Sequence, residues 1–129
     1  MRTGSCLCGA VAYAVEGEMK PPVACHCREC RQQSGHHFAA SETREDALTL
    51  TRDEGLAWYK TSNFASRGFC KFCGSTMFWS RDGSPLIHVL AGTLDAPTGL
   101  RMGAHMWTSQ KGDYYEITDG LRQVEGDEI

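Results

Sequence analysis

Large side chains recur at every second position in residues 9–17 (GAVAYAVEG), which is the period of a β-strand with one buried face. Further stretches rich in β-branched and aromatic residues are bounded by Gly, Pro, Asp and Ser, which mark turns. These further predicted strands are residues 36–42, 47–51, 56–61, 66–70, 76–80, 86–92 and 104–108.

Helical periodicity is weak except in residues 26–34 (HCRECRQQS), where we expect a short helix. Fourteen glycines supply turns between the strands. A single flat sheet would leave an apolar face in water, so we expect two packed sheets. The predicted fold class is therefore all-β, with antiparallel sheets and little helix.

The chain has 129 residues, a length that predicts one domain spanning residues 1–129. Hydrophobic residues make up 41% and charged residues 22%, which is ordinary globular composition. The N-terminus has no uninterrupted apolar segment typical of a secretion signal, and no run of about 18 apolar residues could span a membrane. We expect a cytoplasmic protein without a membrane partner.

The formal net charge of -3 argues against general binding to nucleic acid or to anionic lipid, because no surface that neutralises phosphate is evident. The sequence also has no basic arm. We therefore expect no nucleic-acid partner.

Seven cysteines fall into three groups, in the segments CLC, CHCREC and CKFC. Structural disulfides are rare in the reducing cytosol, and an odd number would leave one thiol unpaired in any compartment. The cysteines therefore indicate metal ligation.

The first and third groups can form one closed metal site. Cys6 and Cys8 are two residues apart, so both side chains point to the same side of an extended segment. Cys70 and Cys73, followed by Gly74, form the turn of a zinc knuckle. Two such pairs complete a tetrahedral thiolate site, and we assign this four-cysteine site to a structural zinc ion.

The second group, Cys25, Cys27 and Cys30, can converge from one local segment. Three protein ligands leave a fourth coordination position open, which distinguishes catalytic from structural zinc. Thiolates donate more charge to zinc than imidazoles do, so this three-cysteine site is better suited to holding an external thiolate than to making a strong hydroxide.

Three other readings of the cysteines stay open on the sequence alone. One is a single four-cysteine zinc site with three unused thiols. Another is closure of the three-cysteine site by a nearby histidine, His26, His36 or His37. The third is an iron–sulfur cluster, for which a CxC pair is an uncommon element.

Two further residue types have ordinary structural interpretations. We expect Trp58, Trp79 and Trp107 to belong to the core, as tryptophan usually does in a small β domain, rather than to line a ligand groove. His88 alternates with apolar neighbours, so we expect a hydrogen-bonded sheet histidine rather than a metal ligand.

The order of five motifs resembles the glutathione-dependent formaldehyde-activating enzyme family, which includes centromere-protein-V-like proteins. The motifs are GSCLCGAV (4–11), CHCRECR (25–31), FCKFCGS (69–75), AGTLD (91–95) and YEITDGL (115–121). The resemblance implies a zinc-containing all-β fold of the Mss4-like (β-tent) type. It also implies structural zinc in the four-cysteine site and a second, weakly held zinc ion in the three-cysteine site, the division made above.

The resemblance implies a zinc-dependent carbon–sulfur lyase that joins a thiol, glutathione, to formaldehyde to give an S-hydroxymethyl adduct. Glutathione carries two carboxylates, which cations near the metal would orient. Arg31 and Lys111 are our candidates for this substrate-binding role.

Two hypotheses compete with this activity. A non-catalytic zinc-binding module that holds a protein partner is favoured by the absence of any identifiable acid or base in the sequence. A redox or metal-buffering role is the other, because exposed thiolates that lose zinc can oxidise to a disulfide.

Overall fold

The computed structural model describes residues 1–129 and contains eleven strands and one α-helix. The strands are β1 (Arg2–Ser5), β2 (Ala12–Val15), β3 (Val23–Cys25), β4 (Phe38–Arg44), β5 (Leu48–Arg52), β6 (Leu56–Lys60), β7 (Ala65–Cys70), β8 (Thr76–Arg81), β9 (Leu86–Leu90), β10 (Ala104–Met106) and β11 (Arg122–Gln123). The helices are α1 (Arg28–Ser34) and the 3-10 turns η1 (Glu45–Ala47), η2 (Ala91–Thr93) and η3 (Thr108–Gln110). No helix has both the length and the apolar character needed to cross a membrane.

The predicted all-β class is confirmed, and each of the eight predicted stretches contains a strand. The expected helix is α1. The sequence pattern did not reveal β1, β3 and β11, which have two to four residues each. Alternation cannot be recognised over so few positions.

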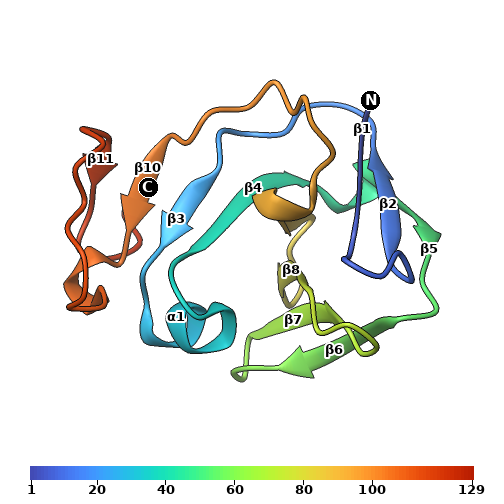
Figure 1. Ribbon diagram of the computed structural model, residues 1–129, viewed down its shortest axis with the longest axis horizontal. Coiled ribbons are helices and arrows are strands. Elements are labelled where there is room, and N and C mark those ends of the chain that lie inside the picture. The colour runs from blue at the N-terminus through green and yellow to red at the C-terminus, as the bar shows by residue number, and fades with distance from the viewer.

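The strands form two sheets, as expected (Figure 1). A three-stranded sheet has the order β1-β2-β5, and an eight-stranded sheet has the order β11-β10-β3-β4-β9-β8-β7-β6. Most pairs are antiparallel, but β10 runs parallel to both β3 and β11, a departure from the prediction. A long connection, residues 91–103, precedes β10, so no hairpin forces it to run antiparallel.

The main hydrophobic core contains eleven buried residues from both sheets. Tyr13 of β2 and Phe78 of β8 meet edge to face in it, with ring centroids 5.5 Å apart. Cys6 and Cys70 belong to the same cluster and are 4% and 0% exposed. One metal-ligand group is therefore built into the packing that joins the two sheets.

The eight-stranded sheet carries a row of polar and aromatic side chains on one face. Glu42 pairs with His88, His88 with Trp79, and Trp79 with Arg67. Directly opposed residues on neighbouring strands point to the same face, so the four side chains stand side by side across β4, β9, β8 and β7. Phe38, four residues before Glu42 on β4, shares this face and packs against the three-cysteine site.

Candidate functional site

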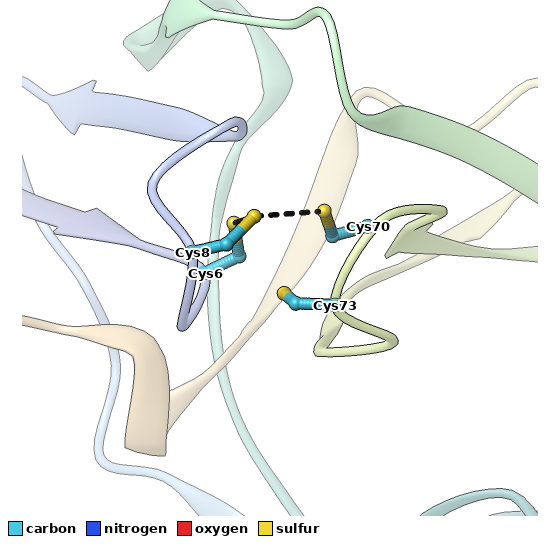
Figure 2. A group of neighbouring side chains, drawn as sticks. All are labelled: Cys6, Cys8, Cys70 and Cys73. Carbon is cyan, nitrogen blue, oxygen red and sulfur yellow. Dashed lines mark hydrogen bonds between the residues drawn. The ribbon is translucent and has the colours of Figure 1, made fainter.

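The four-cysteine site forms where two loops meet at the edge of the main core (Figure 2). Cys6 and Cys8 follow β1, while Cys70 ends β7 and Cys73 lies in the turn before β8. All four sulfur atoms lie within 4.8 Å of one another. The structure therefore brings together the two pairs that the sequence assigned to one site.

The spacing of these sulfurs suits a single tetrahedral ion. The Cys6–Cys8 and Cys8–Cys70 sulfur pairs are each 3.7 Å apart. Zinc–sulfur bonds of about 2.3 Å in a tetrahedron place the sulfurs about 3.8 Å apart. All seven cysteines of the chain are free thiols, so none is withdrawn into a disulfide.

Ser75 connects the two loops of the four-cysteine site. The backbone N–H of Leu7 donates to Ser75 Oγ at 3.0 Å, and Ser75 Oγ lies 3.2 Å from Cys73 Sγ. The hydrogen bond between Ser75 and Cys73 lowers the pKa of the Cys73 thiol to about 5. Cys73 is therefore a thiolate at neutral pH, the form that binds metal.

The three-cysteine site comes from a single turn of chain. Cys25 ends β3, Cys27 is the N-cap residue of α1, and Cys30 lies in its first turn. The backbone N–H of Cys30 donates to Cys27 Sγ at 3.4 Å, which holds the two side chains together. The three sulfurs lie within 4.8 Å of one another, separate from the four-cysteine site. A set of three clustered thiols fits a divalent soft metal such as zinc.

The three thiols differ in acidity. Hydrogen bonds with Cys25 and Cys30 lower the pKa of the Cys27 thiol, and the positive charge of Arg67 acts in the same direction. The hydrogen bonds with Cys27 and Cys30 raise the pKa of Cys25. Negative charge therefore concentrates on Cys27.

Arg67 of β7 is a buried cation beside this site that sequence analysis missed. Its side chain is 2% exposed, and its Nη2 donates to Cys30 Sγ at 3.4 Å. The guanidinium also lies over the Phe38 ring, 4.9 Å from the ring centroid. In the sequence, Arg67 is one polar residue of a predicted strand, and nothing in the local pattern indicates its burial.

The three-cysteine site opens into a cavity of about 890 Å³. The cavity runs over the polar row of the eight-stranded sheet and is flanked by β10 and the C-terminal segment. Its basic lining residues are Lys20, Arg28, Arg67, Arg81 and Arg122, and its acidic ones are Glu29, Glu42 and Asp127. The site thus offers three thiols and a surplus of cations to a small molecule.

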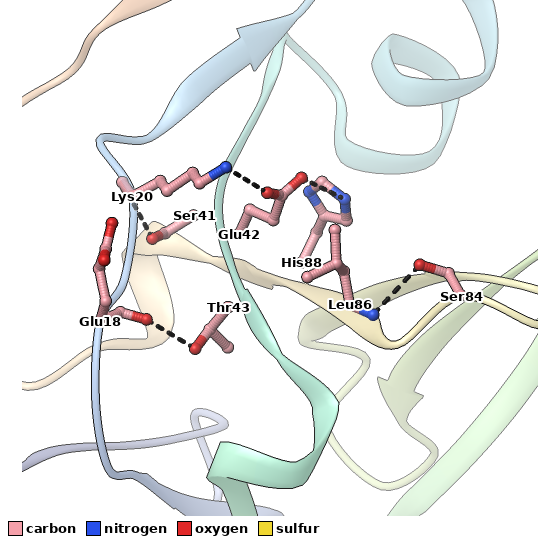
Figure 3. Close-up of polar contacts among 8 residues, drawn as sticks. All are labelled: Glu18, Lys20, Ser41, Glu42, Thr43, Ser84, Leu86 and His88. Atoms are coloured by element: carbon pink, nitrogen blue, oxygen red, sulfur yellow. Dashed lines mark hydrogen bonds and ion pairs between the residues drawn. The ribbon is translucent and has the colours of Figure 1, made fainter.

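Glu42 and His88 form an acid–base pair on the cavity wall. Figure 3 shows the Glu42 carboxylate between Lys20, at 3.0 Å, and His88 Nε2, at 3.7 Å. Burial lowers the pKa of His88, and the Glu42 charge partly offsets this effect. His88 is a sheet residue that belongs to neither cysteine group, and its contact with Glu42 is an ion-pair distance rather than a hydrogen bond. It also faces the cavity, which the alternation did not reveal.

Behind the three-cysteine site lies a hydrogen-bonded chain of four side chains, which is buried at both histidines and exposed at Asp119. His26 Nδ1 contacts the Tyr115 hydroxyl, His26 Nε2 lies 2.8 Å from His105 Nδ1, and His105 Nε2 lies 2.7 Å from Asp119 Oδ2. Burial lowers the pKa of His26 to about 4, so the ring is neutral at pH 7. Because Asp119 only accepts, the donors run from Tyr115 through both rings to Asp119. This chain fixes the backbone between Cys25 and Cys27.

The histidines near the cysteines do not complete the three-cysteine site. His26 points into the hydrogen-bonded chain described above, and His36 and His37 pack with Tyr114 and Tyr115. None of these rings belongs to the three-thiol group. Closure by a histidine therefore finds no support in the geometry.

The two cations chosen from the sequence lie near Gln110 rather than in the cavity lining. Arg31 Nε donates to the Gln110 carbonyl at 3.0 Å. Lys111 donates to the carbonyls of Gly112 and Tyr115 and lies over the Tyr115 ring. Their role in substrate binding stays a prediction.

The expectation that the tryptophans form the core was wrong. None of the three belongs to the buried core. Trp79 and Trp107 line the cavity, and Trp58 is 46% exposed on β6. For Trp79 the reason is the strand register, which places its side chain beside that of His88 on the sheet face that carries the cavity.

Comparisons with known proteins agree with this architecture. A curated relative, an uncharacterized lyase of Schizosaccharomyces pombe, is 26% identical over 127 residues, covering 98% of this chain and 92% of that protein. A crystal structure of a Rhodobacter sphaeroides protein superposes with a TM-score of 0.63 at 28% identity, covering 73% of this chain and 88% of that one. Residues 1–110 match the profile described as glutathione-dependent formaldehyde-activating enzyme, and the chain therefore belongs to this family.

Proposed function

We propose that this protein is a carbon–sulfur lyase that joins a thiol to formaldehyde, with glutathione as the thiol. The thiol sulfur supplies the electron pair of a new carbon–sulfur bond, the carbon–oxygen π bond breaks, and the thiol proton ends on oxygen. The product is the S-hydroxymethyl adduct, and the reverse reaction releases formaldehyde. Family membership and the lyase named among its relatives support this reaction type.

The observation that carries the proposal is the position of the three-cysteine site. Its thiols lie at a cavity large enough for a small peptide thiol, whereas the four-cysteine site has a full tetrahedral set of ligands. Zinc bound by Cys25, Cys27 and Cys30 would supply a fourth coordination position at which an external thiol is held as thiolate. A site with only three protein ligands also fits a metal ion that is weakly held.

The cavity residues would bind the substrate and move its proton. Lys20 and Arg122 place positive charge on the wall, where the carboxylates of glutathione can pair with them. Trp79 packs against Cys30 and Phe38 and gives the cavity an apolar wall beside the sulfurs. Neutral His88, supported by Glu42, accepts the thiol proton and returns it to the carbonyl oxygen. Seven free thiols favour a reducing compartment such as the cytosol.

Exchange spectroscopy by NMR tests the activity. The rate at which glutathione and formaldehyde interconvert with the adduct is measured with zinc-loaded wild-type protein and with Cys27→Ser, at matched folding by circular dichroism. We expect acceleration by the wild type and the uncatalysed rate with Cys27→Ser. Equal acceleration by both proteins would sink the proposal.

A second candidate is a non-catalytic zinc module that binds a protein partner. Leu7 and Phe72, the spacer residues beside the four-cysteine ligands, are 89% and 65% exposed, so both loops of this site present a large apolar side chain to a partner. A wild-type protein that binds its metal and gives no acceleration with any small thiol and aldehyde would favour this reading.

A further inference from the structure

Arg67 is a buried charge with very few partners. It lies on β7 with 2% of its surface exposed, at the end of the row that begins with Glu42. None of its nitrogen atoms forms an ion pair with a carboxylate. A guanidinium removed from water without an anionic partner strongly destabilises a folded protein. Its retention here requires negative charge nearby.

The only hydrogen bond of the Arg67 side chain is to the three-cysteine site. Nη2 donates to Cys30 Sγ, while Nε and Nη1 are buried and have no hydrogen-bond partner. The Phe38 ring covers the guanidinium on one side. Arg67 is thus a cavity-lining cation that contacts the three-cysteine site through one nitrogen and keeps two donors unused. Such donors match an additional anion at this position.

We propose that Arg67 is the specificity-determining residue of the three-cysteine site and makes this site select an anionic ligand, a thiolate, over a neutral one. This inference rests on the proposed function and deepens it. Three thiolates and a divalent ion already carry net negative charge, so a further thiolate is repelled unless a cation offsets it. Arg67 supplies that cation without the mobility of a surface lysine.

Arg81 offers a matched control in the same cavity. It also lines the cavity and also lies over an aromatic ring, that of Phe64 at 4.7 Å. Unlike Arg67, it is exposed and makes no hydrogen bond to a cysteine. Replacing Arg81 removes one positive charge from the cavity wall while leaving the surroundings of the sulfurs unchanged.

The test measures ligand binding to cobalt-loaded protein rather than catalysis. Wild type, Arg67→Met, Arg67→Lys and Arg81→Met are loaded with Co²⁺, and their metal content and thermal unfolding are compared. Each is titrated with 2-mercaptoethanol, an uncharged thiol, and with imidazole, a neutral donor. Sulfur-to-cobalt charge-transfer absorption reports a new thiolate ligand, and the visible bands report imidazole.

We expect Arg67→Met to weaken thiol binding by about 10- to 100-fold, the range for a lost hydrogen bond to a charged group. Imidazole binding should be unchanged, Arg67→Lys should show a partial loss, and Arg81→Met should match the wild type. If Arg67→Met fails to fold, Arg67→Gln, which lacks the charge and keeps a donor for Cys30, answers the same question.

The outcomes separate this inference from the proposed function. Equal thiol affinity in wild type and Arg67→Met overturns the role of Arg67 and leaves the proposed lyase intact. An equal loss for thiol and imidazole also overturns it, because a general disturbance of the site has no preference for anions. Failure of the wild type itself to bind thiol overturns both.

Discussion

The two cysteine groups use the same side-chain chemistry and differ in how the chain delivers it. The four-cysteine site joins segments more than sixty residues apart, and the hydrogen bond between Cys8 and Cys70 spans that separation. The three-cysteine site is built within six residues, from Cys25 to Cys30. A metal ion in the first site closes a long loop, whereas one in the second closes almost none.

The surroundings of the two cysteine sites also differ. Cys6 and Cys70 are part of the main core, so metal binding there is coupled to packing of the sheets. The three-cysteine site instead lies beside a cavity and a buried cation. One group is therefore suited to stability and the other to ligand binding.

Removing a ligand of the four-cysteine site should have the largest effect. Cys70→Ser, or strong chelation of the wild type, should unfold the protein, because a structural zinc site contributes on the order of 10 kcal/mol to folding. Thermal unfolding followed by circular dichroism, with and without chelator, measures the loss. A chelated protein with unchanged thermal stability would show that the site is not structural.

His88→Gln should lower the rate of adduct formation by about a hundredfold, the lower end of the range for a lost general base, while both metal sites remain filled. Burial depresses the pKa of His88 below its ordinary value of 6.5, so the neutral base is present at pH 7 and is lost only as the pH falls through the lowered value. The pH–rate profile should therefore show an acid limb below pH 6.5 that is missing in the variant. A profile identical to that of the wild type would remove His88 from the mechanism.

Gly55→Ala should destabilise the folded protein at the four-cysteine site, because Gly55 packs directly against the ligand Cys70. A Cβ at this position would lie 2.8 Å from Cys70 Sγ and 2.9 Å from Ala10 Cβ, so the expected destabilisation is about 1–3 kcal/mol. Gly92→Ala is the control, since its Cβ would have no neighbour within 4 Å. Urea unfolding of both variants at saturating zinc gives the comparison, and equal stabilities would mean that the contact with Cys70 is easily relieved.

Cys27→Ser should have the smallest effect on stability, below about 1 kcal/mol, because it removes a ligand from a locally formed site outside the main core. The same denaturant titration measures it against Cys70→Ser. A loss as large as that of Cys70→Ser would erase the distinction between a structural and a functional group.

The sequence predicted those parts of the molecule that are encoded locally. Alternation in residues 9–17 identified one strand, and β-branched and aromatic content between turn residues identified the seven others, because both signals are visible within a few residues. Cysteine spacing predicted both thiol groups, because the bite of CxC and CxxC segments is set by neighbouring backbone.

What the sequence did not reveal depends on pairing between distant strands. Glu42, His88 and Arg67 lie on three different strands and become neighbours of one cavity only through the order β4-β9-β8-β7. His105 and Asp119 reach His26 through the parallel position of β10, which a hairpin-based reading could not anticipate. An acid–base pair was missed for the same reason.

The most direct test of the division into two sites is the number of metal ions per chain, measured by elemental analysis of reduced protein supplied with a modest zinc excess and then desalted. Two separate sites should hold two zinc ions in the wild type and one in Cys27→Ser, with the fold preserved in both. One zinc ion in the wild type and an unchanged value in Cys27→Ser would contradict this division, since the three cysteines would then hold no metal.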